Sequence, residues 1–174
     1  QKALYLDAEH EDGYIRDKSV FSEEISIEDT MAVLVRYKNN VLMTYSLNAY
    51  IPKEGFRVVF NGSKGRMEVE VLEGTYTNAS SDSSKEGALK KKRITIFPMH
   101  SKEFYEVPIE EAAGGHGGGD PLLLNDIFGT PVEDKFHRSA NHVDGAMSIL
   151  TGVAANKSIA AGGMPIKIDD LVKF

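Results

Sequence analysis

Apolar and polar residues alternate along residues 31–47, and this period of two predicts a pair of half-buried strands. The two apolar rows are Met31, Val33, Val35 and Tyr37, and then Val41, Met43, Tyr45 and Leu47. A two-residue turn between the strands would put the rows on opposite faces, whereas a loop over residues 38–40 pairs Tyr37 with Val41 and keeps both rows on one face. Because Asn40 tolerates the left-handed conformation that ends such a loop, we predict the three-residue loop.

A second hairpin and two further strands are expected downstream. Alternating apolar positions flank a turn at residues 61–65 and recur later: Phe56, Val58, Phe60, Met67, Val69, Val71, then Ile94, Ile96, Phe104 and Val107. Residues 74–92 are rich in Ser, Asn and Lys without periodicity, so we predict a mobile loop there. The strands together predict an open, mostly antiparallel sheet of about six strands, with one face richer in polar side chains.

The pattern changes at the glycine-rich run 114–119. Asp120 and Pro121 follow as an expected N-cap and first helical residue of a short helix that continues to Phe128. Residues 1–29, in contrast, are polar and irregular, and we interpret them as a lead-in along the surface.

A longer helix is expected from about Asn141 to Ala161, because apolar residues recur there at helical spacing. Asn141 and Asp144 are placed to form a capping box, and Gly162-Gly163 ends the helix. Ile166 and Ile168 predict a last short strand before a terminal turn. A sheet followed by helices indicates an α+β fold with helices packed on one face of the sheet.

Composition limits the possible functions. The chain has 174 residues, which suggests a single domain over residues 1–174, and its net charge of -6 argues against nucleic acid as a partner. Cysteine is absent, and no apolar run is long enough to span a membrane. Because the chain begins at Gln1 rather than Met, we expect the beginning of the natural polypeptide to be missing. The compartment is open: cytoplasmic by default, or periplasmic if the parent carries a signal peptide.

Four segments in order carry a resemblance to a known family: residues 27–31, residues 45–50, the loop 115–121, and residues 142–145 leading through Ser158 to residues 165–168. Together they resemble the C-terminal domain of the glucose–fructose oxidoreductase / inositol dehydrogenase / MocA (Gfo/Idh/MocA) family, over nearly the whole chain.

The resemblance implies a two-domain parent enzyme whose N-terminal Rossmann domain binds NAD or NADP and supplies a lysine near the reacting carbon. It also implies that the sheet face makes subunit contacts in a homo-oligomer. We expect no cofactor binding by this chain alone, because a G-x-G-x-x-G fingerprint read from Gly115 needs glycine where Asp120 stands.

His116 is the best catalytic candidate. Five glycines flank it, it precedes an expected helix N-terminus, and an imidazole can exchange a proton with a carbinol. The resemblance places this loop near the substrate. The alternative interpretation is an exposed histidine on a flexible glycine loop.

Candidate substrate-binding residues are Asp120, His142, Asp144, Tyr45 and Asn48. Four of the five also have an ordinary structural role: capping for Asp120 and Asp144, packing for Tyr45 and turn formation for Asn48. The acidic run around His10 has metal-capable side chains, but adjacent residues rarely converge on one ion, so no metal site is expected.

The sequence therefore predicts the substrate-binding domain of an NAD(P)-dependent oxidoreductase acting on a sugar or cyclitol hydroxyl. Two alternatives stay open. One is a non-catalytic carbohydrate-binding or assembly module, and the other is an NAD-dependent glycoside hydrolase of the same family.

Overall fold

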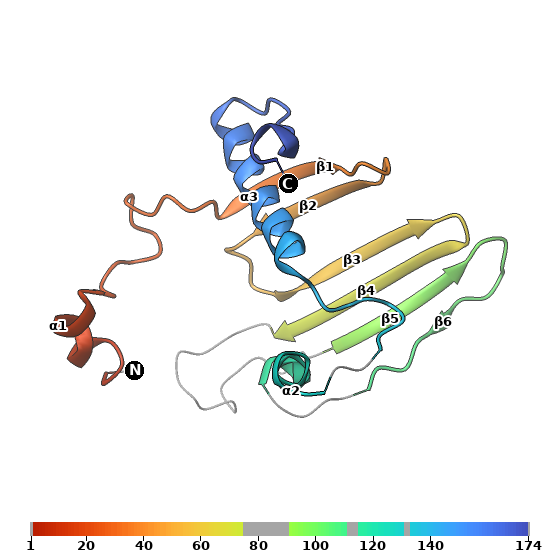
Figure 1. The fold of residues 1–174 in the computed structure, drawn as a ribbon, viewed down its shortest axis with the longest axis horizontal. Coiled ribbons are helices and arrows are strands. Elements are labelled where there is room, and N and C mark those ends of the chain that lie inside the picture. Colours follow the sequence, from red (N-terminus) through yellow and green to blue (C-terminus); the bar gives the residue numbers. More distant parts are fainter. Residues whose placement is uncertain (1, 75–90, 111–114, 131–132, 174) are drawn as a thin grey trace. The chain divides into compact units, whose positions relative to one another are not determined.

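The computed structural model describes residues 2–74, 91–110, 115–130 and 133–173 (Figure 1). The chain divides into two compact units, Gln1–Ile51 and Pro52–Phe174. The first contains a two-stranded sheet, and the second contains a four-stranded sheet and the two long helices. The described residues thus have the predicted α+β composition with antiparallel strands, although the six strands are divided between two sheets.

The first unit begins with two short helices, η1 (Leu6–Ala8) and α1 (Glu9–Asp12). The sequence pattern gave no sign of them, because neither is long enough to develop an apolar stripe. Gly13 ends α1 in the left-handed conformation at φ 71°. No further helix or strand is assigned between this point and residue 30, in agreement with the predicted irregular lead-in.

The hairpin of the first unit consists of β1 (Thr30–Arg36) and β2 (Leu42–Asn48). Val35 lies opposite Met43, and the Tyr37 N–H donates to the Val41 carbonyl at 2.9 Å. Asn40 has φ 66° and closes the loop in the left-handed region. The predicted register and loop are therefore confirmed, with both apolar rows on one face.

The sheet of the second unit contains β3 (Glu54–Gly62), β4 (Gly65–Gly74), β5 (Lys91–Pro98) and β6 (Tyr105–Glu106), in that spatial order and all antiparallel. Val58 lies opposite Val69, as the alternation predicted. The turn between β3 and β4 is tighter than predicted. Gly65 has φ 149°, and a Cβ there would lie 2.3 Å from the Phe97 carbonyl oxygen, so this position requires glycine.

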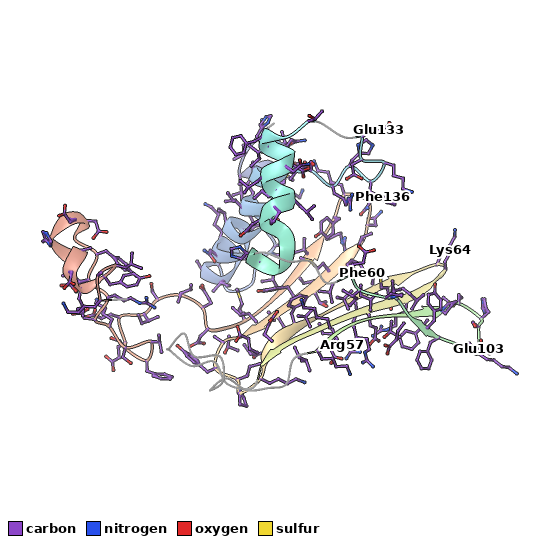
Figure 2. All side chains as sticks on the ribbon, turned by 90° about the horizontal axis from the view of Figure 1, so that it is seen from below. Arg57, Phe60, Lys64, Glu103, Glu133 and Phe136 are labelled. Atoms are coloured by element: carbon purple, nitrogen blue, oxygen red, sulfur yellow. The ribbon has the colours of Figure 1, made fainter. Side chains whose placement is uncertain are left out.

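The two faces of this four-stranded sheet differ in chemistry. Alternation and register give one face the apolar residues Phe56, Val58, Phe60, Met67, Val69, Val71, Ile94 and Ile96. The opposite face carries ion pairs: Glu68 with Arg57 (2.5 Å) and Arg66 (2.7 Å), and Glu70 with Arg93 (3.1 Å). Figure 2 labels one residue of each face on β3, Phe60 and Arg57. The predicted polar enrichment of one face is therefore a set of ion pairs, in which Arg57–Glu68 and Arg93–Glu70 join neighbouring strands and Arg66–Glu68 lies within β4.

Ion pairing on the charged face also lowers the pKa of one carboxyl group, that of Glu68. Hydrogen bonds from the guanidinium groups of Arg66 and Arg57 lower the pKa of Glu68 below its ordinary value. Thr95, on the neighbouring strand opposite Glu68, is only 4% exposed.

The predicted loop over residues 74–92 lies largely outside the described residues. At its ends, Gly74 closes β4, and Lys91 and Lys92 open β5.

The first long helix, α2 (Gly115–Phe128), begins six residues before Pro121, the predicted first helical residue, so the prediction of Asp120 as N-cap is wrong. Pro121 lies inside the helix, and His116 and Gly118 have positive φ values of 51° and 89° in its first turns. A glycine run is typical of a loop, but here the helix already begins within the run, at Gly115. Asp120 therefore contacts a side chain one turn earlier instead of capping backbone N–H groups.

The second long helix, α3 (His142–Ala160), has the predicted limits within one residue at each end. Asn141 caps it, and the Gly163 N–H donates to the Ser158 carbonyl at 2.7 Å as the helix ends. The predicted strand around Ile166 and Ile168 is wrong: residues 164–167 belong to no helix or strand, and no strand among the described residues pairs with them. The 3-10 helix η3 (Ile168–Asp170) follows instead.

Candidate functional site

The candidate catalytic histidine is paired with a carboxylate. In the first turns of α2, His116 Nδ1 lies 2.8 Å from Asp120 Oδ1. The two residues are four positions apart, which places them on one face of a helix. The His116 side chain is 88% exposed and that of Asp120 is 48% exposed. Their contact was not foreseen, because residues four apart meet only when the segment between them is helical.

This pairing determines which ring nitrogen is available. An ionised carboxylate only accepts hydrogen bonds, so the Nδ1 that faces Asp120 carries the proton. In neutral imidazole the other nitrogen, Nε2, is then an acceptor. His116 Nε2 can therefore take a proton from a hydroxyl group that approaches from solvent, while Asp120 fixes the orientation of the ring.

The candidates at the start of α3 have a different arrangement. Asp144 Oδ2 accepts from the Asn141 N–H at 3.0 Å, and Asn141 Oδ1 accepts from the N–H groups of Val143 (2.8 Å) and Asp144 (3.1 Å). The predicted capping box is confirmed, so Asp144 has a structural role. His142 is the first residue of the helix and is exposed to solvent.

Tyr45 and Asn48 lie on β2 in the first unit. They are three positions apart on one strand, so their side chains project from opposite faces of the hairpin. Tyr45 is 45% exposed and lies opposite Val33. Asn48 lies in the strand opposite Thr30, so the expected turn at Asn48 is wrong. These two side chains do not form one binding surface with each other.

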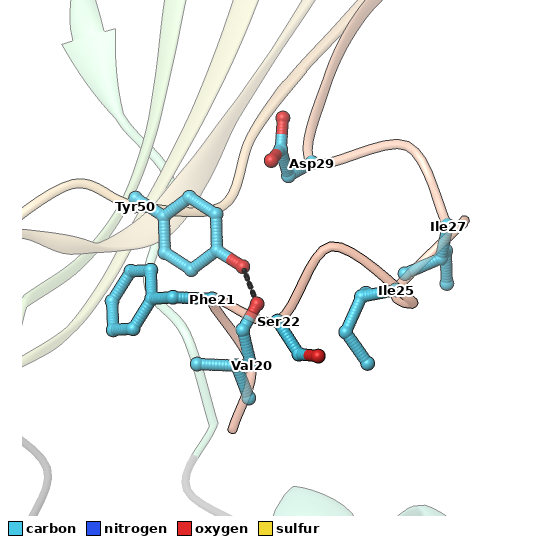
Figure 3. Close-up of a pocket in the computed structure, with 7 residues that line it drawn as sticks. All are labelled: Val20, Phe21, Ser22, Ile25, Ile27, Asp29 and Tyr50. Carbon is cyan, nitrogen blue, oxygen red and sulfur yellow. Dashed lines mark hydrogen bonds between the residues drawn. The ribbon is translucent and has the colours of Figure 1, made fainter. Parts of the chain in front are cut away.

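The first unit also contains an open hollow of about 230 Å3. Its lining residues are Val20, Phe21, Ser22, Ile25, Ile27, Asp29 and Tyr50. Figure 3 shows the rings of Phe21 and Tyr50 on one side and Ile25 and Ile27 on the other. The sequence pattern did not predict this hollow. The signal was present in the apolar residues that interrupt the acidic stretch 20–29, but it has no regular period.

A second feature that the sequence did not reveal is the segment between α2 and α3. Asp134 accepts from the N–H groups of Phe136 (3.0 Å) and Arg138 (2.9 Å) and from Arg138 Nε (2.9 Å). The Arg138 guanidinium and these backbone donors lower the pKa of Asp134 to about 2. Asp134 thereby organises the connection that leads into the capped start of α3.

The described residues do not fit a dinucleotide. Every strand pair among them is antiparallel, whereas the dinucleotide fingerprint belongs to a parallel strand–helix–strand unit. Within these same ranges, no group of three or more His, Asp or Glu side chains is placed to hold a metal ion. None of the helices in the described ranges has both the length and the apolar character needed to cross a membrane.

Comparison with known proteins gives two matches. Residues 5–168 match the family described as "Oxidoreductase family, C-terminal alpha/beta domain". A Bacillus subtilis (strain 168) protein named "Putative oxidoreductase YteT" is 37% identical over 163 residues, which are 92% of this chain and 34% of that protein. No solved structure is significantly similar to the chain.

These matches define an oxidoreductase domain. The chain belongs to the Gfo/Idh/MocA C-terminal domain family, as the four ordered segments implied. It spans about a third of the length of the curated relative that it matches.

Proposed function

We propose that this chain is the substrate-binding domain of an NAD(P)-dependent oxidoreductase that acts on a hydroxyl group of a sugar or cyclitol. The observation that carries the proposal is the exposed pair of His116 and Asp120, with 2.8 Å between Nδ1 and Oδ1. Membership of an oxidoreductase family supports the reaction class.

The chemistry assigned to the pair is a proton transfer. Oxidation of an alcohol to a carbonyl removes the hydroxyl proton and a hydride, which is the hydrogen of the carbon–hydrogen bond together with both bonding electrons. His116 Nε2 accepts that proton, because Asp120 occupies the Nδ1 side of the ring. A base held at the hydroxyl typically accelerates such a step by about 10²–10⁴-fold.

NAD or NADP, when bound, supplies the electron acceptor. We assign its binding to the remainder of a longer protein, because the described residues do not fit a dinucleotide and the chain spans about a third of its relative. The missing partner is therefore an N-terminal domain of the Rossmann type. The chain alone contributes substrate contacts and the proton acceptor.

The direct test is an activity screen with the full-length protein. NAD and NADP are each supplied with a panel of monosaccharides, cyclitols and aryl glycosides, and formation of reduced nicotinamide is followed by absorbance. Net reduction with a free sugar or cyclitol is the expected result. Release of the aryl group without net reduction would favour the glycoside hydrolase alternative. No turnover with any polyol would contradict the proposal.

A second role, assembly of copies of this chain through the four-stranded sheet, is favoured by exposed apolar residues on β3. Phe56, Val58 and Phe60 share one face and are 55%, 39% and 54% exposed. Such a row on an open sheet is typical of a surface that another protein covers. We propose that this face joins copies into a homo-oligomer. Light scattering on the chain tests it, since a monomer at every concentration would contradict it.

A further inference from the structure

Residues 20–29 form most of the hollow in the first unit. Two hydrogen bonds connect this segment to the end of the β1–β2 hairpin. The Tyr50 hydroxyl donates to the Val20 carbonyl at 2.8 Å, and the Ala49 N–H donates to the Asp29 carbonyl at 2.7 Å. The rings of Phe21 and Tyr50 also lie 5.1 Å apart between centroids. These contacts act at both ends of the stretch 20–29, so the segment curves around an open space next to the hairpin (Figure 3).

Most of the residues that line this space are aliphatic or aromatic, polar atoms contribute to its surface as well, and both are available to a ligand. Phe21 is 78% exposed, Ile27 is 77% exposed and Tyr50 is 52% exposed. The volume of about 230 Å3 is below the roughly 300–1,000 Å3 of ordinary small-molecule sites. The size therefore suits one side chain better than a complete metabolite.

The polar groups of the lining are a carboxylate and a hydroxyl, from Asp29 and Ser22. In the described part of the chain, the Asp29 carboxylate has no ion-pair partner. The nearest cation that precedes Asp29 in sequence, Lys18, is paired with Glu24, and the nearest one that follows, Arg36, lies at the far end of β1. The hollow thus combines aromatic and aliphatic walls with one uncompensated negative charge, and this combination is complementary to an alkyl chain that ends in a cation.

We propose that this hollow binds a single lysine or arginine side chain from another polypeptide. The alkyl stem lies against Phe21, Ile25 and Ile27, and the cationic head pairs with Asp29 at the rim. The small volume and the charge complementarity together favour a protein side chain over a free metabolite. The inference does not depend on the oxidoreductase activity, because none of these residues belongs to the α2 site.

The test uses this chain and two short blocked peptides in NMR titrations of backbone amides. One peptide has a central lysine, and the other has norleucine, which keeps a similar alkyl stem without the charge. The lysine peptide is expected to shift amides of residues 20–29 and 49–50 saturably with weak, millimolar affinity. It should bind up to about fivefold more tightly than the norleucine peptide, which is the upper end of the range for an exposed ion pair. Absence of saturable shifts overturns the proposal, and so does tighter binding of free n-butylamine than of the lysine peptide.

Matched variants distinguish the contribution of the Asp29 charge to peptide binding from that of the apolar side chains that line the hollow. Asp29→Asn should abolish the preference for lysine over norleucine, whereas Asp17→Asn, which removes an equal charge from the same unit outside the hollow, should keep it. Phe21→Ala should weaken both peptides alike. Phe21→Ala could detach residues 20–29 from the hairpin. Asp29→Asn still tests the proposal in that case, because it leaves the apolar side chains of the hollow unchanged. An unchanged lysine preference in Asp29→Asn would overturn the assignment.

Discussion

The N-cap of α3 allows a stability prediction that can be worked out bond by bond. Asn141 Oδ1 accepts from two backbone N–H groups at 2.8 and 3.1 Å, and the Asp144 carboxylate returns a hydrogen bond to the Asn141 N–H at 3.0 Å. Asn141→Ala removes the first two bonds and leaves those donors to water. Since the site is exposed, water replaces part of what is lost, so the cost is that of a cap and not that of a buried unpaired group.

Replacing an N-cap Asn by Ala typically costs about 1 kcal/mol, within a range of roughly 0.5–2. For a domain of 150–250 residues, about 1 kcal/mol lowers the melting temperature by roughly 2–4 °C. Asn141→Ser should be nearly neutral, because a serine hydroxyl accepts the same bonds. Asn156→Ala is the matched control, since it makes the same change on the exposed interior of the same helix. It should be neutral or slightly stabilising because alanine is the better helix former.

Urea unfolding followed by circular dichroism measures these differences. Asn141→Ala should lower the midpoint without changing the slope, which would mean that stability changed and the extent of unfolding did not. Equal midpoints for Asn141→Ala and Asn156→Ala would refute the reasoning, because the loss could then not be attributed to the cap.

Three further predictions follow from individual contacts. Asp120→Asn should lower turnover of the full-length protein on the order of tenfold to a hundredfold. This loss is smaller than the roughly 10⁴-fold effect of a buried carboxylate partner, because Asp120 is 48% exposed. Unchanged turnover would mean that Asp120 does not orient His116. Asp134 has its pKa lowered to about 2, so its stabilising contribution is fully present above about pH 4 and is lost as the pH falls through about 2. The free energy of unfolding should therefore depend less steeply on pH over this range in Asp134→Asn than in the wild type. Identical pH dependence in the two proteins would contradict the role of the carboxylate. Val58→Asp should convert an oligomer into smaller species by light scattering, whereas Val41→Asp in the β1–β2 loop should not; equal effects would exclude the β3 face.

The sequence predicted those parts of the fold that short-range rules determine. The register of β1 and β2 follows from one loop residue, Asn40, whose left-handed conformation makes the three-residue connection possible. The start of α3 follows from Asn141 and Asp144, which satisfy each other's backbone donors. In both cases the stabilising groups lie within a few residues of one another, so the local sequence is sufficient to predict the structure.

The errors arose where local preferences and the observed structure disagree. The glycine run favours a loop and Pro121 favours the first turn of a helix, yet α2 already begins at Gly115, and this brings His116 and Asp120 together. Ile166 and Ile168 suggested a strand, but a strand needs a partner strand to pair with, and the local sequence does not specify one. The ion pairs of the charged sheet face depend on register across three strands, which alternation alone does not provide.

The proton-accepting role of His116 is the central claim, and one kinetic comparison tests it most directly. In the full-length protein, turnover of His116→Asn is compared with that of His100→Asn. Both histidines have positive φ, 51° and 61°, which asparagine tolerates, so the backbone consequences are matched. The account predicts a loss of about 10²-fold or more in kcat for His116→Asn alone, with melting temperatures within about 2 °C of the wild type. Equal turnover of the two variants would contradict it.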